Sequence, residues 1–280
     1  MRARKDSKDL GTDHGGVSNR EDKDLERRAK LRVPIIYEAV RRQGEEELRR
    51  PAASLWWSGL AAGLSISFSL LALGILKRAI PNTLWAPLLV SIGYPVGFLM
   101  VVLGRQQLFT ESTLTAVLPV MVNLNPRSLM LTARLWGIVL AANLLGTLIA
   151  AVFCSLTPVL DPPLRDAMLD VSRVAMALAW WPMLFKGITA GFLMAAMVWL
   201  IPNSEGAQFQ VVTLMTWLIA VGGFPHIVAG SMECFMLLIN GDIHIATAII
   251  GFAVPTLIGN VVGGTALFAL ISYAQVMYEI

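Results

Sequence analysis

The sequence predicts an all-α membrane protein with six transmembrane helices, arranged as an inverted repeat of three and three with a broken second and fifth helix. The composition is the first reason, because 56% of the 280 residues are hydrophobic, 15% are charged and the mean hydropathy is +0.65. The second reason is a series of apolar runs of about the 20 residues that a bilayer requires. The third is that motifs of the first half return in the second.

The first fifty residues hold most of the charge. They contain 14 of the 22 Lys and Arg and 11 of the 19 Asp and Glu, so the formal net charge of +3 arises there. Residues 1–33 have few apolar side chains, which predicts a disordered, charged cytoplasmic tail without the hydrophobic core of a signal peptide. The positive charge suits an anionic membrane leaflet and does not indicate a nucleic-acid partner.

Residues 34–50 place apolar side chains among charged ones. Ile36, Val40 and, less regularly, Leu48 recur in this segment, as expected of an amphipathic helix that lies along the membrane surface. A solvated linker is the alternative. Four arginines precede the first apolar run and only Lys77 and Arg78 follow it, which predicts a cytoplasmic amino terminus.

A transport domain is predicted over residues 51–275. Its candidate spans lie near residues 52–76, 84–103, 129–156, 176–201, 211–239 and 246–273. Residues 114–124 are apolar but too few to cross alone, and we interpret them as the second half of a broken second span. Six spans return residues 276–280 to the cytoplasm, in a multi-pass protein of a bacterial inner membrane.

An internal repeat supports this architecture. GLAAGL at residues 59–64 returns as GITAGF at residues 187–192, and ANLLGT at residues 142–147 returns as GNVVGG at residues 259–264. Between these pairs, QQLFTEST and GGFPHIVA interrupt the middle span of each half, and the comparison equates Phe109 with Phe224. Because three spans reverse the chain direction, the halves are expected to be inverted, as in many transporters with a site at the midplane.

Two polar residues at these interruptions are the predicted centre of a pore. In hydrocarbon, irregular backbone persists only where protein or a water-filled cavity satisfies its amides. His226 follows Pro225 in the second interruption, and an imidazole can donate, accept or pass a proton near neutral pH. Thr110 in the first interruption offers a hydroxyl to one ring nitrogen. A buried histidine without a pore function is the alternative.

Other polar residues have two interpretations each. Asn143 and Asn260 are predicted to brace the irregular backbone of the interruptions, or else to bond helix to helix. Lys186 either concentrates anions at a pore mouth or anchors its helix at the membrane interface. The remaining charged candidates are Arg105, Glu111 and Glu233; we favour ion pairs of Arg105 with Glu111 or Glu233 that act as structural braces over direct roles in transport.

These features resemble the formate/nitrite transporter family. The resemblance covers about residues 33–273 and rests on LFTEST, GFPHIVAG, KGITAGFLMAAMVWL and GNVVGG. It implies a homopentamer of six-span protomers in the lipid bilayer, with an aquaporin-like inverted repeat and a pore for small anions and protons in each protomer. The chain departs from the family pattern at Gln107, Gly191 and Gly230, and Glu233 is an addition.

The resemblance also implies positions for pore residues. Leu108, Phe109 and Thr110 match a flexible loop of the second span, and His226 matches a central histidine that faces Thr110. Two constrictions follow from the same match. The cytoplasmic constriction combines Phe98 with Leu108, and the periplasmic one is formed by Tyr94, Met194 and Ile219.

Transport of small monovalent weak-acid anions, by a channel or a proton-coupled pathway, is the function predicted from these residues. A neutral-solute or water pore and a non-transporting membrane scaffold are the alternatives. No nucleotide-binding loop, catalytic motif or metal-ligand spacing occurs in the sequence. We therefore predict neither an enzyme nor a cofactor or metal site.

Overall fold

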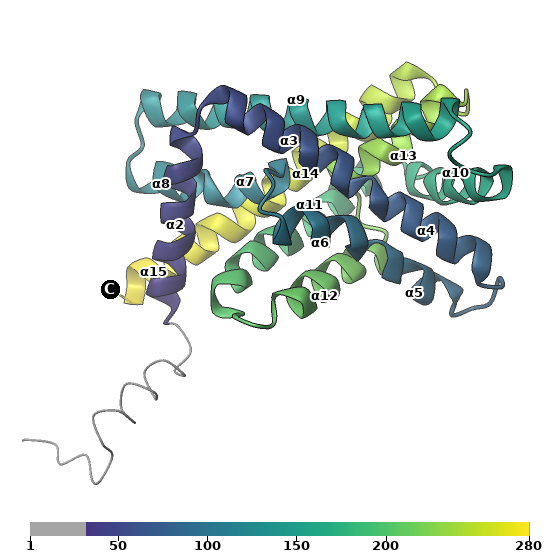
Figure 1. Cartoon of the computed structure of the whole chain (residues 1–280). Helices are drawn as coiled ribbons and strands as arrows, with labels where there is room; N and C mark the ends of the chain where they lie inside the picture. Colours follow the sequence, from purple (N-terminus) through teal and green to yellow (C-terminus); the bar gives the residue numbers. More distant parts are fainter. Residues whose placement is uncertain (1–31, 280) are drawn as a thin grey trace, which may run out of the picture. The chain divides into compact units, whose positions relative to one another are not determined.

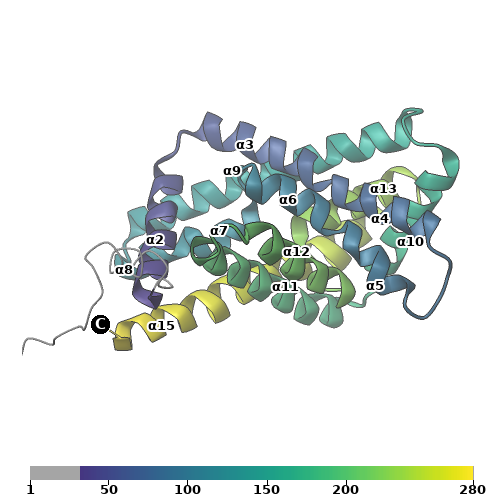
Figure 2. The ribbon, with the colours of Figure 1, turned by 60° about the horizontal axis from the view of Figure 1, so that its bottom comes forward.

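The computed structural model describes residues 32–279, and the regular structure within this range is helical. Figure 1 shows the arrangement and Figure 2 shows it after a rotation. Residues 1–31 of the predicted tail lie outside the described residues. The elements are α2 (Val33–Arg49), α3 (Ala52–Ile66), α4 (Phe68–Ala79), α5 (Ala86–Val90), η1 (Ser91–Gly93), α6 (Pro95–Leu103), α7 (Phe109–Thr115), α8 (Val117–Val122), α9 (Pro126–Leu156), α10 (Pro162–Met176), α11 (Trp180–Leu200), η2 (Ile201–Asn203), α12 (Gln208–Val221), α13 (Ile227–Ile239), η3 (Thr247–Ala253), α14 (Val254–Val261), η4 (Val262–Ala269) and α15 (Leu270–Glu279).

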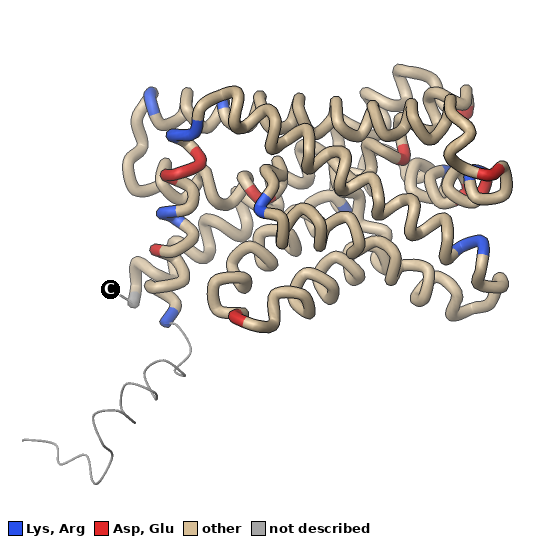
Figure 3. Tube along the Cα trace, viewed as in Figure 1, with Lys and Arg blue, Asp and Glu red and all other residues tan. Residues whose placement is uncertain are grey.

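Several helices are suited to a bilayer. Within residues 32–279, five stretches are long and apolar enough to cross it: Ala52–Ala79, Ala86–Leu103, Pro126–Leu156, Trp180–Asn203 and Thr247–Tyr278. Three shorter apolar stretches are Phe109–Val122, Gln208–Val221 and Ile227–Ile239. Lys, Arg, Asp and Glu gather toward the two ends of the helical body and are sparse between them (Figure 3), as a hydrocarbon layer requires.

Two interruptions divide the middle helices of the chain. The first interruption, residues 104–108, separates α6 from α7, and the second interruption, residues 222–226, separates α12 from α13. Residues 211–239, the predicted fifth span, therefore form two helices. Neither helix is long enough to cross a bilayer alone.

Close packing through small residues is repeated in the two halves. α3 packs against α9, where an added Cβ at Gly63 would clash with the carbonyl oxygen of Asn143. α11 packs against α14 and η4, where a Cβ at Gly191 would clash with the carbonyl oxygen of Asn260. Glycine thus lets two helix backbones approach closely at equivalent places.

Helix α2 is packed against protein. Ile36, Tyr37 and Val40 are buried together with residues of α7, α8, α11 and α15. A Cβ at Gly44 would clash with the carbonyl oxygen of Thr115. α2 and α15 lie side by side in both views (Figures 1 and 2). The segment is therefore a helix and not a linker, while its placement along a membrane surface stays a prediction.

Helix α10 was not predicted from the sequence, which assigned its residues to a connection and to the beginning of the fourth span. Asp161 caps it by accepting a hydrogen bond from the Leu164 N–H at 2.9 Å, and Pro162 supplies a favourable first helical residue. The hydrogen bond from the Leu164 N–H and, to a smaller extent, the bond from the Arg78 guanidinium hold the pKa of Asp161 below its ordinary value. An Asp followed by prolines was the signal available in the sequence.

Candidate functional site

The two interruptions have the same backbone course. In the first, Arg105 adopts a left-handed conformation with φ 49°, and in the second Gly223 does so with φ 58°. The Gln106 N–H then donates to Val101 O at 3.0 Å, and the Phe224 N–H donates to Ile219 O at 3.0 Å. In both cases the chain continues in extended conformation to the N-cap of the next helix, which is Leu108 for α7 and His226 for α13.

A buried asparagine holds each interruption. Asn143 Nδ2 donates to Gly59 O at 2.8 Å and to Gln107 O at 2.9 Å, while its Oδ1 accepts from the Phe109 N–H at 2.9 Å. Asn260 makes the same three bonds, to Gly187 O at 2.9 Å, to Pro225 O at 3.0 Å and from the Ile227 N–H at 2.8 Å. Both side chains are fully buried. Two of the three bonds satisfy a carbonyl and an N–H that each interruption leaves without a helical partner, and the third ties the asparagine to a neighbouring helix, α3 or α11.

These bonds correct the register of the repeat. The sequence comparison equated Phe109 with Phe224, but the hydrogen bonds make Gln106 the equivalent of Phe224 and Phe109 the equivalent of Ile227. The shared letter Phe was misleading, because backbone geometry and not side-chain type defines the equivalence. As a result, Leu108 and His226 occupy equivalent N-cap positions.

His226 and Thr110 are in direct contact. The Thr110 Oγ1 lies 2.7 Å from His226 Nε2, which joins the two interruptions at their helix starts. The other ring nitrogen, Nδ1, accepts the Ala229 N–H at 3.1 Å and so caps α13. A nitrogen that accepts this bond carries no proton, so the neutral ring has its hydrogen on Nε2 and donates it to Thr110.

Aromatic and aliphatic side chains surround this contact. The Phe98 ring meets the His226 ring edge to face with centroids 5.1 Å apart, and the centroid of the Tyr94 ring also lies 5.1 Å from that of Phe98. Phe98, Leu108, Phe109 and Met194 are all buried. Phe109 packs against Trp136 of α9. The predicted Phe98–Leu108 constriction stays a prediction, but Phe98 lies against His226 itself.

One cavity reaches His226. This cavity, the His226 cavity, has a volume of about 450 Å³ and is lined by residues that include Tyr94, Lys186, Ile219, His226 and Glu233. Two members of the predicted periplasmic constriction thus line it, and the third, Met194, does not. The Lys186 ammonium donates to the Gly222 carbonyl oxygen at 3.3 Å, at the start of the second interruption.

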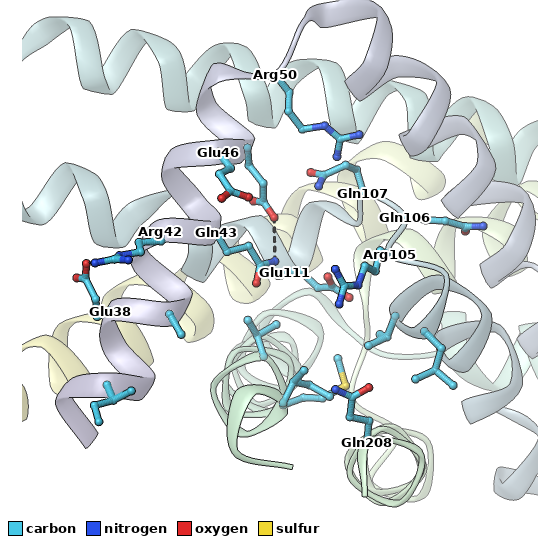
Figure 4. A pocket seen from close by; sticks show the side chains of 18 of the residues that line it. Glu38, Arg42, Gln43, Glu46, Arg50, Arg105, Gln106, Gln107, Glu111 and Gln208 are labelled. Atoms are coloured by element: carbon cyan, nitrogen blue, oxygen red, sulfur yellow. Dashed lines mark hydrogen bonds and ion pairs between the residues drawn. The ribbon is translucent and has the colours of Figure 1, made fainter. Parts of the chain in front are cut away.

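A second cavity reaches the first interruption. This cavity, the Glu111 cavity, has a volume of about 1060 Å³ and is lined by residues of α2, by residues 105–107 and by Glu111. In Figure 4 the side chains of Gln43, Arg105 and Glu111 converge on this space. The lining is rich in polar and charged side chains at the end of α6.

The predicted braces of Arg105 are absent. Within residues 32–279, Arg105 forms no ion pair with Glu111 or Glu233, and it is exposed at the rim of the Glu111 cavity. Glu111 Oε1 is buried without a hydrogen-bond partner, and Glu233 lines the other cavity. The side chain of Arg105 lines the Glu111 cavity without an ion pair to either glutamate, which the sequence alone did not indicate.

Glu47 is a buried polar residue that the sequence analysis missed. Its Oε2 accepts from Thr115 Oγ1 at 2.6 Å and its Oε1 accepts from Gln43 Nε2 at 3.0 Å. Burial raises the pKa of Glu47, because the carboxylate loses water. It stands in a run of three glutamates, so no local signal distinguished it. Through Thr115 it attaches α2 to the helix that carries Thr110.

Comparisons with known proteins agree with this geometry. Residues 34–274 match a family model described as Formate/nitrite transporter. The chain is 45% identical over 251 residues to "Inner membrane protein YfdC" of Escherichia coli K12, which covers 90% of this chain and 81% of that protein. Two solved structures share the fold. One is titled "Pentameric formate channel with formate bound", with TM-score 0.68, 18% identity and coverage of 81% of this chain and 98% of that one. The other is titled "FNT family ion channel", with TM-score 0.71, 16% identity and coverage of 87% and 98%.

Proposed function

Because the chain belongs to the formate/nitrite transporter family, we propose that it conducts small monovalent weak-acid anions, such as formate or nitrite, across a membrane. The pathway runs between the His226 cavity and the Glu111 cavity, past the contact of His226 with Thr110. The observation that carries this proposal is the 2.7 Å contact itself, since His226 lines one cavity and Glu111, the neighbour of Thr110, lines the other.

The proposed architecture is an inverted repeat of three crossings and three. α3–α4, α5–α8 and α9 form one half, and α11, α12–α13 and η3–α15 form the other. The identical bonds of Asn143 and Asn260 support the repeat. The side-by-side placement of α2 and α15 supports a common side for both described ends, which the arginines before the first span assign to the cytoplasm.

We expect the protein to assemble as a homopentamer in the lipid bilayer of the bacterial inner membrane. Large apolar side chains such as Trp57, Trp181 and Phe185 are more than half exposed on one chain. A soluble monomer would expose few such groups in contiguous patches, whereas lipid and neighbouring subunits cover them in a membrane oligomer. The pentameric title of a solved structure with this fold supports the same assembly.

The mechanism follows from charge and desolvation. An anion that enters an apolar layer loses its water at a large cost, while the neutral acid pays far less. Lys186, half-buried in the His226 cavity, attracts the anion. The anion is protonated in that cavity and passes as the acid. At the centre, a solute oxygen accepts from the Thr110 hydroxyl, whose hydrogen has no acceptor among the described residues.

Uptake into proteoliposomes tests the proposal. Purified full-length protein should give saturable uptake of formate or nitrite, stimulated by an acidic exterior, and lactate and acetate complete the panel. Liposomes without protein are the control. If none of the four solutes enters in a saturable manner, the proposed function is wrong. Osmotic swelling without anion uptake would instead indicate a neutral-solute pore.

A further inference from the structure

Glu233 lies in the His226 cavity without a protein partner. It stands on α13 seven residues after His226, which places it about 10 Å further along the same helix face. The side chain is 7% exposed, and it makes no hydrogen bond or ion pair within residues 32–279. The buried Glu47, in contrast, has bonds to both carboxylate oxygens.

The wall next to Glu233 is apolar. Gly230, one helical turn earlier, has no side chain, and the Phe252 ring fills that place, since a Cβ at Gly230 would lie 2.8 Å from Phe252 Cζ. An unpaired carboxylate is costly to bury in such surroundings, so the group is stabilised by a proton or by a ligand. The other titratable or charged groups that line the cavity or adjoin Glu233 are Lys77, Tyr94, Asp170, Lys186, His226 and Cys234.

His226 is poorly placed to carry an additional proton. Its Nδ1 accepts the Ala229 N–H and its Nε2 faces Thr110. A second ring proton would have to sit on Nδ1, where it would point at the Ala229 N–H and remove the cap of α13. In this geometry the imidazole is a fixed neutral donor, so a proton for the solute comes from another group or from the water of the cavity.

We propose that Glu233 is the proton donor of the His226 cavity, which makes it a determinant of proton coupling that acts before His226. This inference rests on the proposed function. In the step, the Glu233 carboxyl O–H bond breaks and the proton forms the O–H bond of the weak acid. The carboxylate that remains takes a proton from hydronium in the water of the cavity, so each neutral acid that crosses carries one proton from that side.

The test uses full-length protein in proteoliposomes that contain a pH-sensitive dye, with labelled formate as the probe. Glu233→Gln keeps the size and the hydrogen-bonding capacity of the side chain but has no proton to transfer. It should lower formate uptake by about tenfold or more and abolish the internal acidification that accompanies uptake. Glu233→Asp keeps the acid and should retain coupled uptake. Glu205→Gln, an exposed residue between η2 and α12, is the matched control and should behave as the unchanged protein.

The overturning results are distinct. Unchanged uptake in Glu233→Gln would show that the carboxyl group takes no part in transport, and increased uptake would show that it hinders transport. Either result contradicts the inference and leaves the proposed function intact. Absence of uptake in the unchanged protein removes both proposals. If Glu233→Gln does not assemble, the infrared carbonyl band of the protonated carboxyl decides: it should weaken when formate is added to the unchanged protein, and an unresponsive band contradicts the inference.

Discussion

The first and second interruptions share a backbone and differ in their side chains. Each turns through one left-handed residue and is held by one buried asparagine. At the equivalent N-cap, however, the first has Leu108 and the second His226. The two interruptions thus share a backbone geometry, whereas the N-cap side chain is apolar in the first and an imidazole in the second.

The surroundings of the interruptions differ as well. Beside the first, α2 is attached through Glu47 to Thr115 of α7, and α2 and residues 105–107 line the Glu111 cavity together. The second borders the His226 cavity, where Lys186 and Glu233 face the solvent space. The first interruption also borders the Glu111 cavity, so both interruptions adjoin a cavity, and the cavity beside the second is the one lined by Lys186 and Glu233. Variants at Asn143 and Asn260 test the shared backbone geometry, and variants at His226 test the polar group of the second interruption.

Removal of either asparagine should have the largest effect. Asn143→Ala and Asn260→Ala each delete three buried hydrogen bonds and leave one carbonyl and one N–H at the interruption without a partner. We expect each to lower the free energy of unfolding by about 3 kcal/mol or more. Because the bonds are equivalent, the two losses should agree within about 1 kcal/mol. Denaturation of the purified proteins in detergent measures both, and a large loss at only one position would contradict a shared scaffold.

His226→Asn separates the cap from the pore chemistry. Asparagine is a good N-cap and can still accept the Ala229 N–H, but it lacks the ring nitrogen that faces Thr110. We expect stability to fall by about 1 kcal/mol or less, while formate uptake falls by about tenfold or more, equal to about 1.4 kcal/mol in the barrier. His226→Leu, which copies the side chain of Leu108, should lose the cap as well. Undiminished uptake in His226→Asn would show that the ring contributes only capping.

Much of this comparison could be predicted from the sequence, for identifiable reasons. Polar residues marked the first interruption within its apolar run, glycine, proline and histidine marked the second, and paired asparagines indicated their braces. The register of the repeat could not be predicted, because it depends on a left-handed turn that Arg105 adopts without being glycine. The Glu47–Thr115 bond joins residues 68 positions apart, so no local pattern reveals it.

The attachment of α2 to the first interruption should weaken as pH rises. The pKa of Glu47 is raised by burial, so the folded state holds this proton more tightly than an exposed glutamate does. The stabilisation that this proton gives the folded state is therefore complete below about pH 4.5, the ordinary pKa of a glutamate. It is lost as the pH rises through the higher pKa of Glu47 in the folded state. Hydrogen exchange along α2 should accelerate over that range, by an amount equal to about 1 kcal/mol. Glu47→Gln should remove the pH dependence, and α10 provides an internal reference helix.

The smallest expected effect comes from exchanging the turn residues. Arg105 holds φ 49° and Gly223 holds φ 58° at equivalent places, and the left-handed region costs a side-chain-bearing residue about 1 kcal/mol. Arg105→Gly should therefore gain stability, by about 0.5 kcal/mol after the greater chain entropy of unfolded glycine is subtracted. Gly223→Ala should lose about 1 kcal/mol by the same argument. Denaturation in detergent measures both changes in the free energy of unfolding. A gain for Arg105→Gly and a loss for Gly223→Ala would show that both turns require the same left-handed backbone conformation. Equal signs would mean that the Arg105 side chain stabilises the Glu111 cavity through contacts that outweigh the strain of its turn.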